Sequence, residues 1–431
     1  MRLYKMELYK ICSKKLFLFS AAASLAILLL YMYSAVIDRT TTINGVKYSG
    51  FQAVKMDQQI TAEFSGELTD DKLTKIIEKY GFPSGVEERH YGFLDSNYLN
   101  DFVMEYFSDG YFRGYDDYQV ATRTYPIAET ALGQASAATG KSLQLEYTYG
   151  WQVFYDVLGI GCILGMALML LSLSPVYADE SWQNTRHLLF TTKEGKHRDI
   201  AAKIAAGMTA AVSIFVVIVL VDFLFVACIY GLRGGDCFSG QVLAEEFISQ
   251  YNEYHNSSTW TSMNYILFCI VECFLGFVEV AAVSLYFSSH CKSPFQAIIA
   301  SAMCLFVPVF LNQLGRDNLR GIVFQLNQLS IFLFPGIALM SLVPDTLPPT
   351  VFRIGKVLCC VLPMLIGQYF RHQFPFYYSV PVMLFVNGAA KDLDFIQCQE
   401  GFSWVRQGVF SFAGAVSVLY LVCSWQKYKN S

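Results

Sequence analysis

Three acidic side chains lie inside long apolar runs, where a charge is costly. They are Asp222, Glu272 and Glu279, and the two glutamates are seven residues apart, so a helix places them on one face. A charge at the centre of a membrane helix costs about 2.5 to 3.5 kcal/mol, so each should face the bundle interior or water. Two interpretations are open: a polar translocation path with a cation-binding patch, or structural hydrogen bonds to nearby Ser, Tyr or backbone groups.

A second candidate site is the segment 135–142, which reads ASAATGKS. It follows the phosphate-loop pattern, with Ala in place of the first Gly. A working phosphate loop follows a buried strand and opens a helix, whereas residues 127–132 are not strand-like and no apolar strand ending in Asp follows. We therefore expect Lys141 and Ser142 to belong to a polar linker that binds no nucleotide.

Other catalytic chemistry has little support. His187 and His197 flank a polar loop, but no third ligand stands at metal-binding spacing, and no Ser/His/Asp or Cys/His arrangement stands out. Most of the twelve cysteines lie in apolar runs and should behave as small hydrophobes, although Cys237 and Cys398 could both lie outside the membrane and pair. We expect no enzyme activity, no metal and no cofactor in this chain.

The composition indicates a membrane protein. Hydrophobic residues make up 54 % of the chain and charged residues only 15 %, where roughly 25 % is usual for soluble domains. This argues against a soluble globule of 431 residues. The net charge of −4 gives no support to a nucleic-acid-binding protein, which would concentrate Lys and Arg on one face.

Six apolar stretches are long enough to cross a bilayer as helices, which takes about 20 residues each. The fold class we expect is therefore an all-α polytopic membrane protein with about six core transmembrane helices. The expected spans are residues 16–37, 157–177, 204–230, 265–287, 295–314 and 405–425. The first should be an uncleaved anchor, and Gly161 and Gly165 form a small-residue pair in the second that suits close helix contact.

The segment before the first span, residues 1–15, is basic and amphipathic. A helix here places Tyr4, Leu8, Ile11 and Cys12 along one side. Such a helix could lie in the membrane surface, and a flexible basic tail is the alternative.

Positive charge predicts the orientation, because loops rich in Lys and Arg stay on the cytoplasmic side. Residues 1–15 and the loop 178–203 are basic and should lie inside, whereas the loop 231–264 is acidic and should lie outside. Both termini are then cytoplasmic, in a multi-pass protein of the cell membrane.

Residues 38–150 form the only soluble stretch of domain size and should be a large extracellular domain between the first and second spans. It contains 17 acidic and 10 basic residues, a net charge of −7. Residues 70–80 are predicted to form a helix with Thr69 as N-cap and Gly81 as stop, and 98–107 a second one. The acidic balance suggests that the domain handles a cationic peptide or amphipathic drug.

Residues 315–403 have no settled topology. Several prolines interrupt their apolar pattern, so they form either two extra spans or extracellular, re-entrant helices. Both arrangements leave the C-terminus inside.

The loop 178–203 is more apolar than a solvated loop should be. Its residues 179–190 are predicted to form a short helix, and Trp182, Leu188 and Leu189 are too few to cross a bilayer. Residues 191–195 then break the helix at Gly195. Such an apolar face either lies on the lipid surface or docks in the groove of a partner protein.

The same loop resembles that of the ABC-2 type transporter permeases. Members of this family carry, after the second span, an acidic residue, a small residue followed by Thr, a Leu-Leu pair, a Thr, a Gly turn and a Lys that opens the third span. The matching residues are Glu180, Asn184 and Thr185, Leu188 and Leu189, Thr191, Gly195 with Lys196, and Lys203. Asn184 stands where Gly is commoner.

This resemblance implies a permease subunit that does not itself hydrolyse ATP. Its loop would be a coupling helix that docks on a separate ABC ATPase subunit, present in two copies, which binds ATP and Mg²⁺. A second copy of the permease or a related one would complete the path, and the expected activity is export of a peptide, drug or lipid-like substrate. The residues that the resemblance implies for partner binding are Glu180, Trp182, Arg186, Leu188, Leu189, Thr191, Gly195 and Arg198.

One alternative function stays open. The chain could be a membrane-anchored sensor or assembly protein, whose extracellular domain binds a ligand and whose loop recruits a cytoplasmic partner without transport. A membrane-embedded transferase is disfavoured, because the sequence offers no catalytic cluster for one.

Overall fold

The structure, a computed structural model, describes residues 2–83, 95–114, 117–185, 188–189, 191, 198–238, 261–303 and 354. These residues are mostly helical, and they pack as two compact units. The first unit contains residues 1–27, 159–220 and those from 270 onward, and the second contains residues 28–158 and 221–269.

Three helices of the described part are long and apolar enough to cross a membrane, which indicates a membrane protein. They are α2 (Lys15–Ile37), α7 (Tyr149–Leu173) continued by α8 (Pro175–Trp182), and α10 (Arg198–Ile229). Helix α12 (Ser262–His290) and a shorter apolar helix, Pro294–Met303, follow. The predicted span 295–314 is described only up to residue 303, whereas the predicted span 405–425, and 315–403 apart from residue 354, lie outside the described residues.

Two of these helices begin earlier than the sequence predicts. Helix α7 starts at Tyr149 rather than at residue 157, because its first two turns bury Trp151 and Phe154. Helix α10 starts at Arg198, before the predicted span 204–230, and its first turns contain an ion pair between Asp199 and Lys203. Both helices therefore extend beyond the spans that hydropathy predicts.

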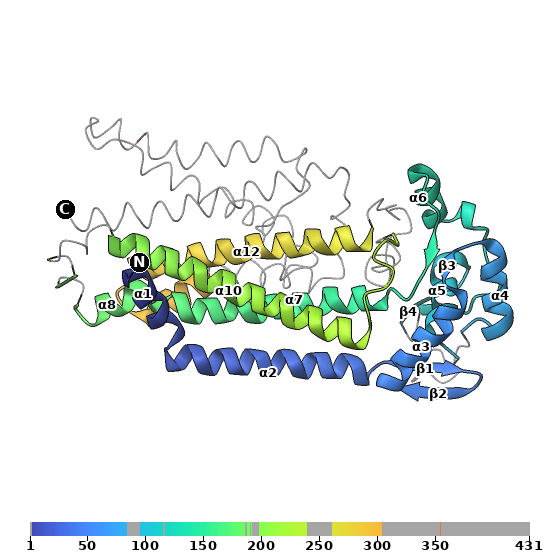
Figure 1. Cartoon of the computed structure of the whole chain (residues 1–431), viewed down its shortest axis with the longest axis horizontal. Coiled ribbons are helices and arrows are strands. Elements are labelled where there is room, and N and C mark those ends of the chain that lie inside the picture. Colours follow the sequence, from blue (N-terminus) through green and yellow to red (C-terminus); the bar gives the residue numbers. More distant parts are fainter. Residues whose placement is uncertain are drawn as a thin grey trace. The chain divides into compact units, whose positions relative to one another are not determined.

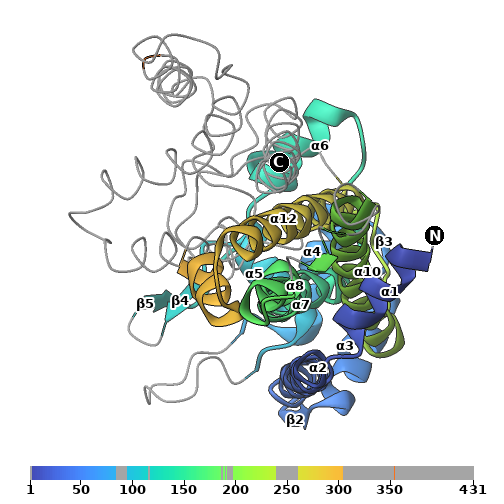
Figure 2. The same ribbon diagram turned by 90° about the vertical axis from the view of Figure 1, so that its left-hand side faces the viewer.

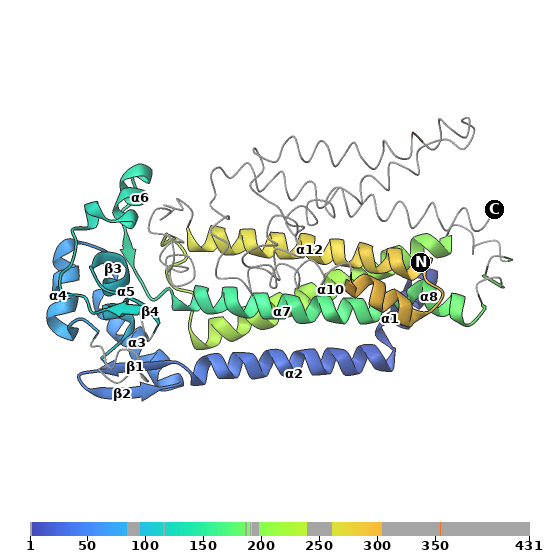
Figure 3. The ribbon, with the colours of Figure 1, turned by 180° about the vertical axis from the view of Figure 1, so that it is seen from behind.

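Within the first unit, α7, α10 and α12 run side by side (Figures 1 and 3). A methyl group at Gly165 of α7 would lie 2.5 Å from Ile218 Cδ1 of α10 and 2.6 Å from Phe277 Cζ of α12. The rings of Phe215 and Phe277 are 5.1 Å apart. Gly165 therefore has the close helix contact that its small-residue pattern predicts.

Helix α1 (Arg2–Cys12) packs against α10 in the same unit (Figure 2). The Tyr4 hydroxyl donates to Thr209 Oγ1 of α10 at 2.9 Å, and Ile11 is buried. Tyr9, on the other side of α1, is exposed. The N-terminal segment is thus a helix rather than a flexible tail, and the predicted apolar side faces protein.

Between α2 and α7 lies a polar region that we call the insertion, residues 38–148. Its described residues are not all helical, because three two-stranded antiparallel sheets accompany the helices there. Its helices are α3 (Phe51–Phe64), α4 (Asp70–Tyr80), α5 (Tyr98–Phe107) and α6 (Ala131–Thr139), with a 3-10 turn η1 (Ile127–Glu129). The paired strands are β1 (Thr40–Ile43) with β2 (Val46–Ser49), β3 (Gly66–Glu67) with β6 (Gln144–Leu145), and β4 (Tyr111–Gly114) with β5 (Asp117–Gln119).

Local signals account for the helices of the insertion that the sequence predicts. Helix α4 covers the predicted residues, with the Thr69 side chain accepting from the Lys72 N–H and Gly81 ending the helix at φ +71°. Helix α5 also has its predicted bounds, and Asn97 caps it by accepting the N–H groups of Leu99 and Asn100. Both helix predictions are confirmed.

The β1–β2 hairpin has a local signal that the sequence analysis overlooked. Its turn is Asn44-Gly45, with φ angles of 52° and 77°. Asn and Gly are the residues that tolerate this left-handed conformation, and the pair is typical of a two-residue hairpin turn. The turn sets the register in which Ile43 faces Val46 and Thr40 faces Ser49.

Candidate functional site

A buried lysine joins α8 to α10 within the segment 178–203, which we call the coupling loop after the role expected from its sequence. Lys203 of α10 is 1 % exposed, and its Nζ donates to Glu180 Oε2 of α8 at 2.6 Å and to Asp199 Oδ2 at 2.5 Å. The ring of Tyr177 lies 5.3 Å from the same nitrogen. A buried ammonium needs such partners, because an unpaired charge away from water is costly. We call Lys203, Glu180 and Asp199 the loop-base cluster.

The end of α7 is fixed from the opposite side by α12. Pro175 begins α8 directly after Ser174, and the N–H groups of Tyr177 and Ala178 donate to Ser288 Oγ at 2.8 and 3.3 Å. Ser288 thereby satisfies backbone donors that a helix start leaves free. The Tyr177 hydroxyl also donates to the Ile200 carbonyl of α10 at 3.3 Å, so α8 is attached to both neighbours.

The N-terminal helix adds charges beside this cluster. Lys14, just after α1, forms an ion pair with Asp179 of α8. Glu7 is buried and accepts from Lys10 Nζ at 2.5 Å. Helices α1, α8 and α10 therefore meet through ionic as well as apolar contacts, which the sequence alone did not predict.

The helix predicted over residues 179–190 ends earlier, at Trp182. Gln183 and Asn184 form a turn in which Asn184 has φ +55°. This left-handed conformation stops the helix, and among non-glycine residues Asn adopts it most readily. The geometry explains how Asn can stand where the resemblance leads one to expect Gly.

The apolar side chains of the coupling loop are left exposed. Trp182, at the end of α8, is 68 % exposed, and Leu188 is 70 % exposed, while Leu189 is half-buried. The Leu188 and Leu189 amides donate to the Thr185 carbonyl, and Thr191 Oγ1 donates to the Leu188 carbonyl at 2.7 Å. Trp182 and Leu188 are thus two large apolar side chains that the described residues leave exposed.

The remaining predicted loop residues are only partly described. Thr191 is exposed, and Arg198 begins α10 and is exposed. Arg186 and Gly195 lie outside the described residues. The structure thus brings Glu180 and Lys203 together in the buried loop-base cluster. It leaves the side chains of Trp182 and Leu188 exposed.

The predicted path of intramembrane acids is described at one position. Asp222 of α10 is fully buried, and neither carboxylate oxygen has a hydrogen-bond partner among the described residues. Glu272 and Glu279 lie within α12, but their side chains are outside the description. The path remains a prediction.

In the second unit, a buried ion pair that the sequence did not predict joins the start of the insertion to its core. Asp57 of α3 is fully buried and accepts from Arg39 Nε at 3.0 Å and Nη2 at 2.6 Å. It also accepts from Thr41 Oγ1 at 2.7 Å and from the Tyr98 N–H at 3.2 Å. Burial lowers the pKa of Arg39, but the charge of Asp57, the neighbouring Tyr149 and Tyr147 and the hydrogen bonds to Asp57 together outweigh it and hold that pKa above its ordinary value.

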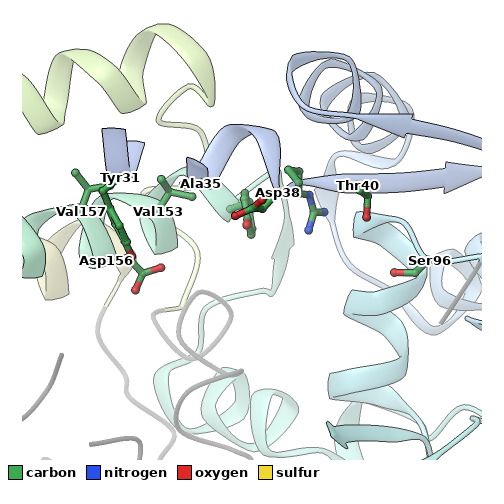
Figure 4. Close-up of a pocket in the computed structure, with 10 residues that line it drawn as sticks. Tyr31, Ala35, Asp38, Thr40, Ser96, Val153, Asp156 and Val157 are labelled. Atoms are coloured by element: carbon green, nitrogen blue, oxygen red, sulfur yellow. The ribbon is translucent and has the colours of Figure 1, made fainter. Parts of the chain in front are cut away.

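A cavity of about 340 Å³ opens beside this ion pair (Figure 4). Helix α2 contributes Tyr31 and Ala35, helix α7 contributes Tyr149, Val153, Asp156 and Val157, and the insertion contributes Asp38, Arg39, Thr40 and Ser96. The Arg39 guanidinium lies 4.4 Å from the centre of the Tyr149 ring. All ten residues belong to the second unit.

The phosphate-loop-like segment has the wrong order of elements for binding nucleotide. Helix α6 ends at Thr139, and Gly140 caps its C-terminus at φ +67°, so the helix precedes the Gly-Lys-Ser residues. A phosphate loop needs the helix to follow them, with its N–H groups aimed at the phosphates. Lys141 and Ser142 are exposed linker residues that lead to β6, as predicted.

Cys237, which was considered for a disulfide, is a free buried thiol. It is 1 % exposed and donates to the Gln144 carbonyl at 3.4 Å, and burial raises its pKa to about 12. Cys398 lies outside the described residues. Among the described residues, no group of three or more His, Cys, Asp or Glu side chains is arranged to hold a metal ion.

Comparison with known proteins adds no relative. No family model matches the chain, and neither the curated proteins nor the solved structures contain a match.

Proposed function

We propose that this chain is the membrane-spanning permease subunit of an ATP-driven transporter, and that its coupling loop docks on a separate ATP-hydrolysing subunit. The observation that carries the proposal is the division of the loop into an exposed apolar face and a fixed base. Trp182 and Leu188 are exposed, while Glu180, only two residues before Trp182, is tied to Lys203.

The exposed face favours a partner because large apolar side chains gain from leaving water. Burying a side chain of this size contributes roughly 1.5 to 3 kcal/mol. Trp182 ends α8, and Leu188 lies six positions further along the chain, so two large apolar side chains are exposed within one short stretch of sequence. An apolar groove of a partner protein would cover both.

The base favours a mechanical role for the loop. Lys203 connects α8, which continues α7, with α10, and Ser288 connects α8 with α12. A push on the loop would therefore reach three apolar helices through short, buried contacts. Transport by alternating access requires this kind of rigid connection between an energy-supplying partner and the membrane helices.

The remaining parts of the proposal follow from the same scheme. Two ATPase copies bind ATP and Mg²⁺, and a second permease copy or a related permease completes the path. The coupling loop and both termini lie in the cytoplasm and the insertion lies outside, in a cell membrane. The transporter exports a peptide, drug or lipid-like substrate, with Asp222, Glu272 and Glu279 as polar residues of the path.

Co-purification tests the docking step. The tagged chain is co-expressed with a candidate ABC ATPase subunit, and recovery of the ATPase is compared between the native chain and the variants Trp182→Asp and Leu188→Asp. We expect each variant to insert normally and to lose most of the ATPase. The matched control is Val46→Asp, because Val46 of β2 is also apolar and 52 % exposed but lies in the insertion.

Two results would overturn the proposal. One is equal recovery of the ATPase with the native chain and both loop variants. The other is equal loss with Val46→Asp, which would mean that any exposed charge disturbs the complex. In that first case, with the ATPase retained by both loop variants, the exposed Trp182 and Leu188 would instead be assigned to contact with the lipid surface.

A further inference from the structure

Helix α1 is held in one rotation about its own axis by the side that packs on α10. Glu7 and Ile11 on that side are buried, and the Tyr4 hydroxyl donates to Thr209 Oγ1. All of these residues belong to the first unit. Because the rotation is fixed, the residues on the opposite side of α1 form a defined surface.

That opposite side combines large apolar side chains with positive charge. Met6 and Tyr9 are 56 % and 73 % exposed, and Lys5 and Lys10 are exposed as well. At about 100° per residue, the apolar pair lies in the middle of this side and one lysine lies on each flank. We call these four residues the outer face of α1.

The charge around the outer face is positive. Residues 2–15 contain five basic residues and one acidic residue, Glu7. Glu7 pairs with Lys10, and Asp179 of α8 pairs with Lys14, so these two carboxylates offset only part of the charge. An anionic ligand is therefore favoured over a cationic one.

The outer face also lies close to the start of a helix long enough to cross a membrane. Only Ser13 and Lys14 separate α1 from α2, and these three residue steps reach at most about 10 Å. Leu18 and Phe19 near the start of α2 are 56 % and 74 % exposed, and in a membrane helix such side chains lie against lipid. The outer face is therefore near the boundary of the bilayer, where the lipid headgroups lie.

We propose that the outer face of α1 binds the headgroups of anionic membrane lipids. Lys5 and Lys10 lie against the lipid phosphates, and Met6 and Tyr9 reach into the boundary between the headgroups and the acyl chains. Lysine side chains are attracted to an anionic membrane surface, and tyrosine is enriched at this depth of the bilayer. The proposal uses no residue of the coupling loop, so failure of ATPase co-purification would leave it standing.

Fluorescence quenching by brominated lipids tests the position of the outer face. The full chain carrying Tyr9→Trp is reconstituted in phosphatidylcholine vesicles in which part of the lipid is brominated near the headgroup end of its acyl chains. Subtracting the emission of the native chain isolates the signal of the added tryptophan. We expect clear quenching for Tyr9→Trp and little for the matched variant Val46→Trp, because Val46 is exposed in the insertion. No more quenching for Tyr9→Trp than for Val46→Trp would overturn the proposal and assign the face to a second copy of the chain or to water.

Changing the headgroup of the brominated lipid tests the charge. Brominated phosphatidylglycerol should quench the added tryptophan of Tyr9→Trp at least about twofold more than brominated phosphatidylcholine does. Adding Lys5→Gln and Lys10→Gln should remove this preference, while quenching by phosphatidylcholine persists because the apolar contact is kept. The control pair, Lys47→Gln with Lys75→Gln, changes two exposed lysines of the insertion and should keep the preference. Equal quenching by the two lipids would overturn the proposal, and so would an undiminished preference in a folded chain that lacks both α1 lysines.

Discussion

Lys203 is balanced only while all three charges of the loop-base cluster are present. It is 1 % exposed, and the Glu180 and Asp199 side chains that face it are themselves largely shielded, at 17 % and 9 % exposed. Taking such groups from water is expensive, so the cluster adds less to stability than its short distances suggest. Its main contribution is to allow one position of α8 relative to α10.

Replacing Lys203 with Met should destabilise the protein strongly. The change leaves two carboxylates without their cation, and breaking a buried ion pair on one side costs about 3 to 5 kcal/mol. Adding Glu180→Gln and Asp199→Asn to Lys203→Met should recover most of the loss. Thermal unfolding in detergent measures both effects.

The matched control for this series is Lys75→Met. Lys75 pairs with Asp71 at 2.6 Å, but both side chains are exposed, at 60 % and 74 %. Water screens such a pair, so no measurable change is expected. A drop for Lys203→Met no larger than that for Lys75→Met would contradict the role of the cluster.

Asp109 gives the insertion a pH dependence in the acidic range. Its carboxylate accepts from Thr122 Oγ1 at 2.6 Å and from the N–H groups of Thr122 and Arg123 at 2.8 and 3.1 Å. The bonds to Thr122, and the further one to Arg123, lower the pKa of Asp109 from 3.8 to about 2. A carboxyl whose pKa is lowered by folding stabilises the fold above its ordinary pKa, and that contribution is lost as the pH falls through about 2.

Hydrogen exchange at the Thr122 and Arg123 amides tests this contribution. Asp109→Asn should speed their exchange at pH 5, because the carboxylate that accepts from them is gone. The difference from the native chain should shrink as the pH falls below 3.8 toward about 2, where the native carboxyl takes up its proton. Asp71→Asn should leave both amides unchanged, and a constant difference across this range would contradict the assignment.

Among the helices and strands, those whose ends are set by neighbouring residues in the chain could be predicted from the sequence. Helices α4 and α5 have their predicted bounds because their caps, Thr69, Gly81 and Asn97, lie next to them in the chain. The early stop of α8 was also a local signal, in Asn184, but it competes with an apolar pattern that continues to residue 190. The prediction from apolar periodicity alone therefore extended the helix to residue 190, whereas α8 ends at Trp182.

Contacts between distant residues could not be predicted in this way. Arg39, Asp57 and Tyr98 are brought together by the packing of α3 and α5 on β1, and each residue looks ordinary in the sequence. Glu180 and Lys203 were both noted, yet their pairing depends on how α8 and α10 pack against each other. Glu180 and Lys203 could be selected from the sequence, whereas the contact between them could be seen only in the folded structure.

The contact between α7, α10 and α12 should be sensitive to size at Gly165. In Gly165→Ala, the new methyl group meets Ile218 and Phe277 at about 2.5 Å, and overpacking of this kind costs about 1 to 3 kcal/mol. Gly159→Ala in the same helix is the matched control, because nothing lies within 4 Å of a methyl group there. That change should be neutral or stabilising by up to about 1 kcal/mol, since Ala favours a helix more than Gly does.

Thermal unfolding of the two glycine variants gives the answer. A lower melting temperature for Gly165→Ala together with an unchanged or higher one for Gly159→Ala is expected. Equal effects at both positions would show that helix propensity, rather than the close approach of the three helices, decides the outcome.

At the scale of the whole molecule, the open question is which parts lie on which side of the membrane. The helical segment Tyr149–Trp182 is 34 residues long, more than the roughly 20 that a span needs. One crossing by this segment separates the insertion from the coupling loop. The excess of Lys and Arg near the loop predicts that the loop is cytoplasmic.

Cysteine labelling of intact cells checks this arrangement. Lys47→Cys, in β2, should react with a membrane-impermeant maleimide, and Gln183→Cys, in the turn after α8, should react only after the cells are opened. The native chain, with its own cysteines, supplies the background. Labelling of both positions in intact cells would contradict a crossing between them.

Arg39 stands two residues beyond the end of α2, and its bonds to Asp57 fix the direction in which that helix emerges. Each residue of an α-helix advances the rotation by about 100°. One alanine inserted into α2 would thus swing the guanidinium away from α3, although the length and hydrophobicity of the span would hardly change. The rotation of α2 about its axis and the position of the Arg39–Asp57 ion pair are therefore linked. Insertions or deletions in α2 should be tolerated less well than apolar substitutions.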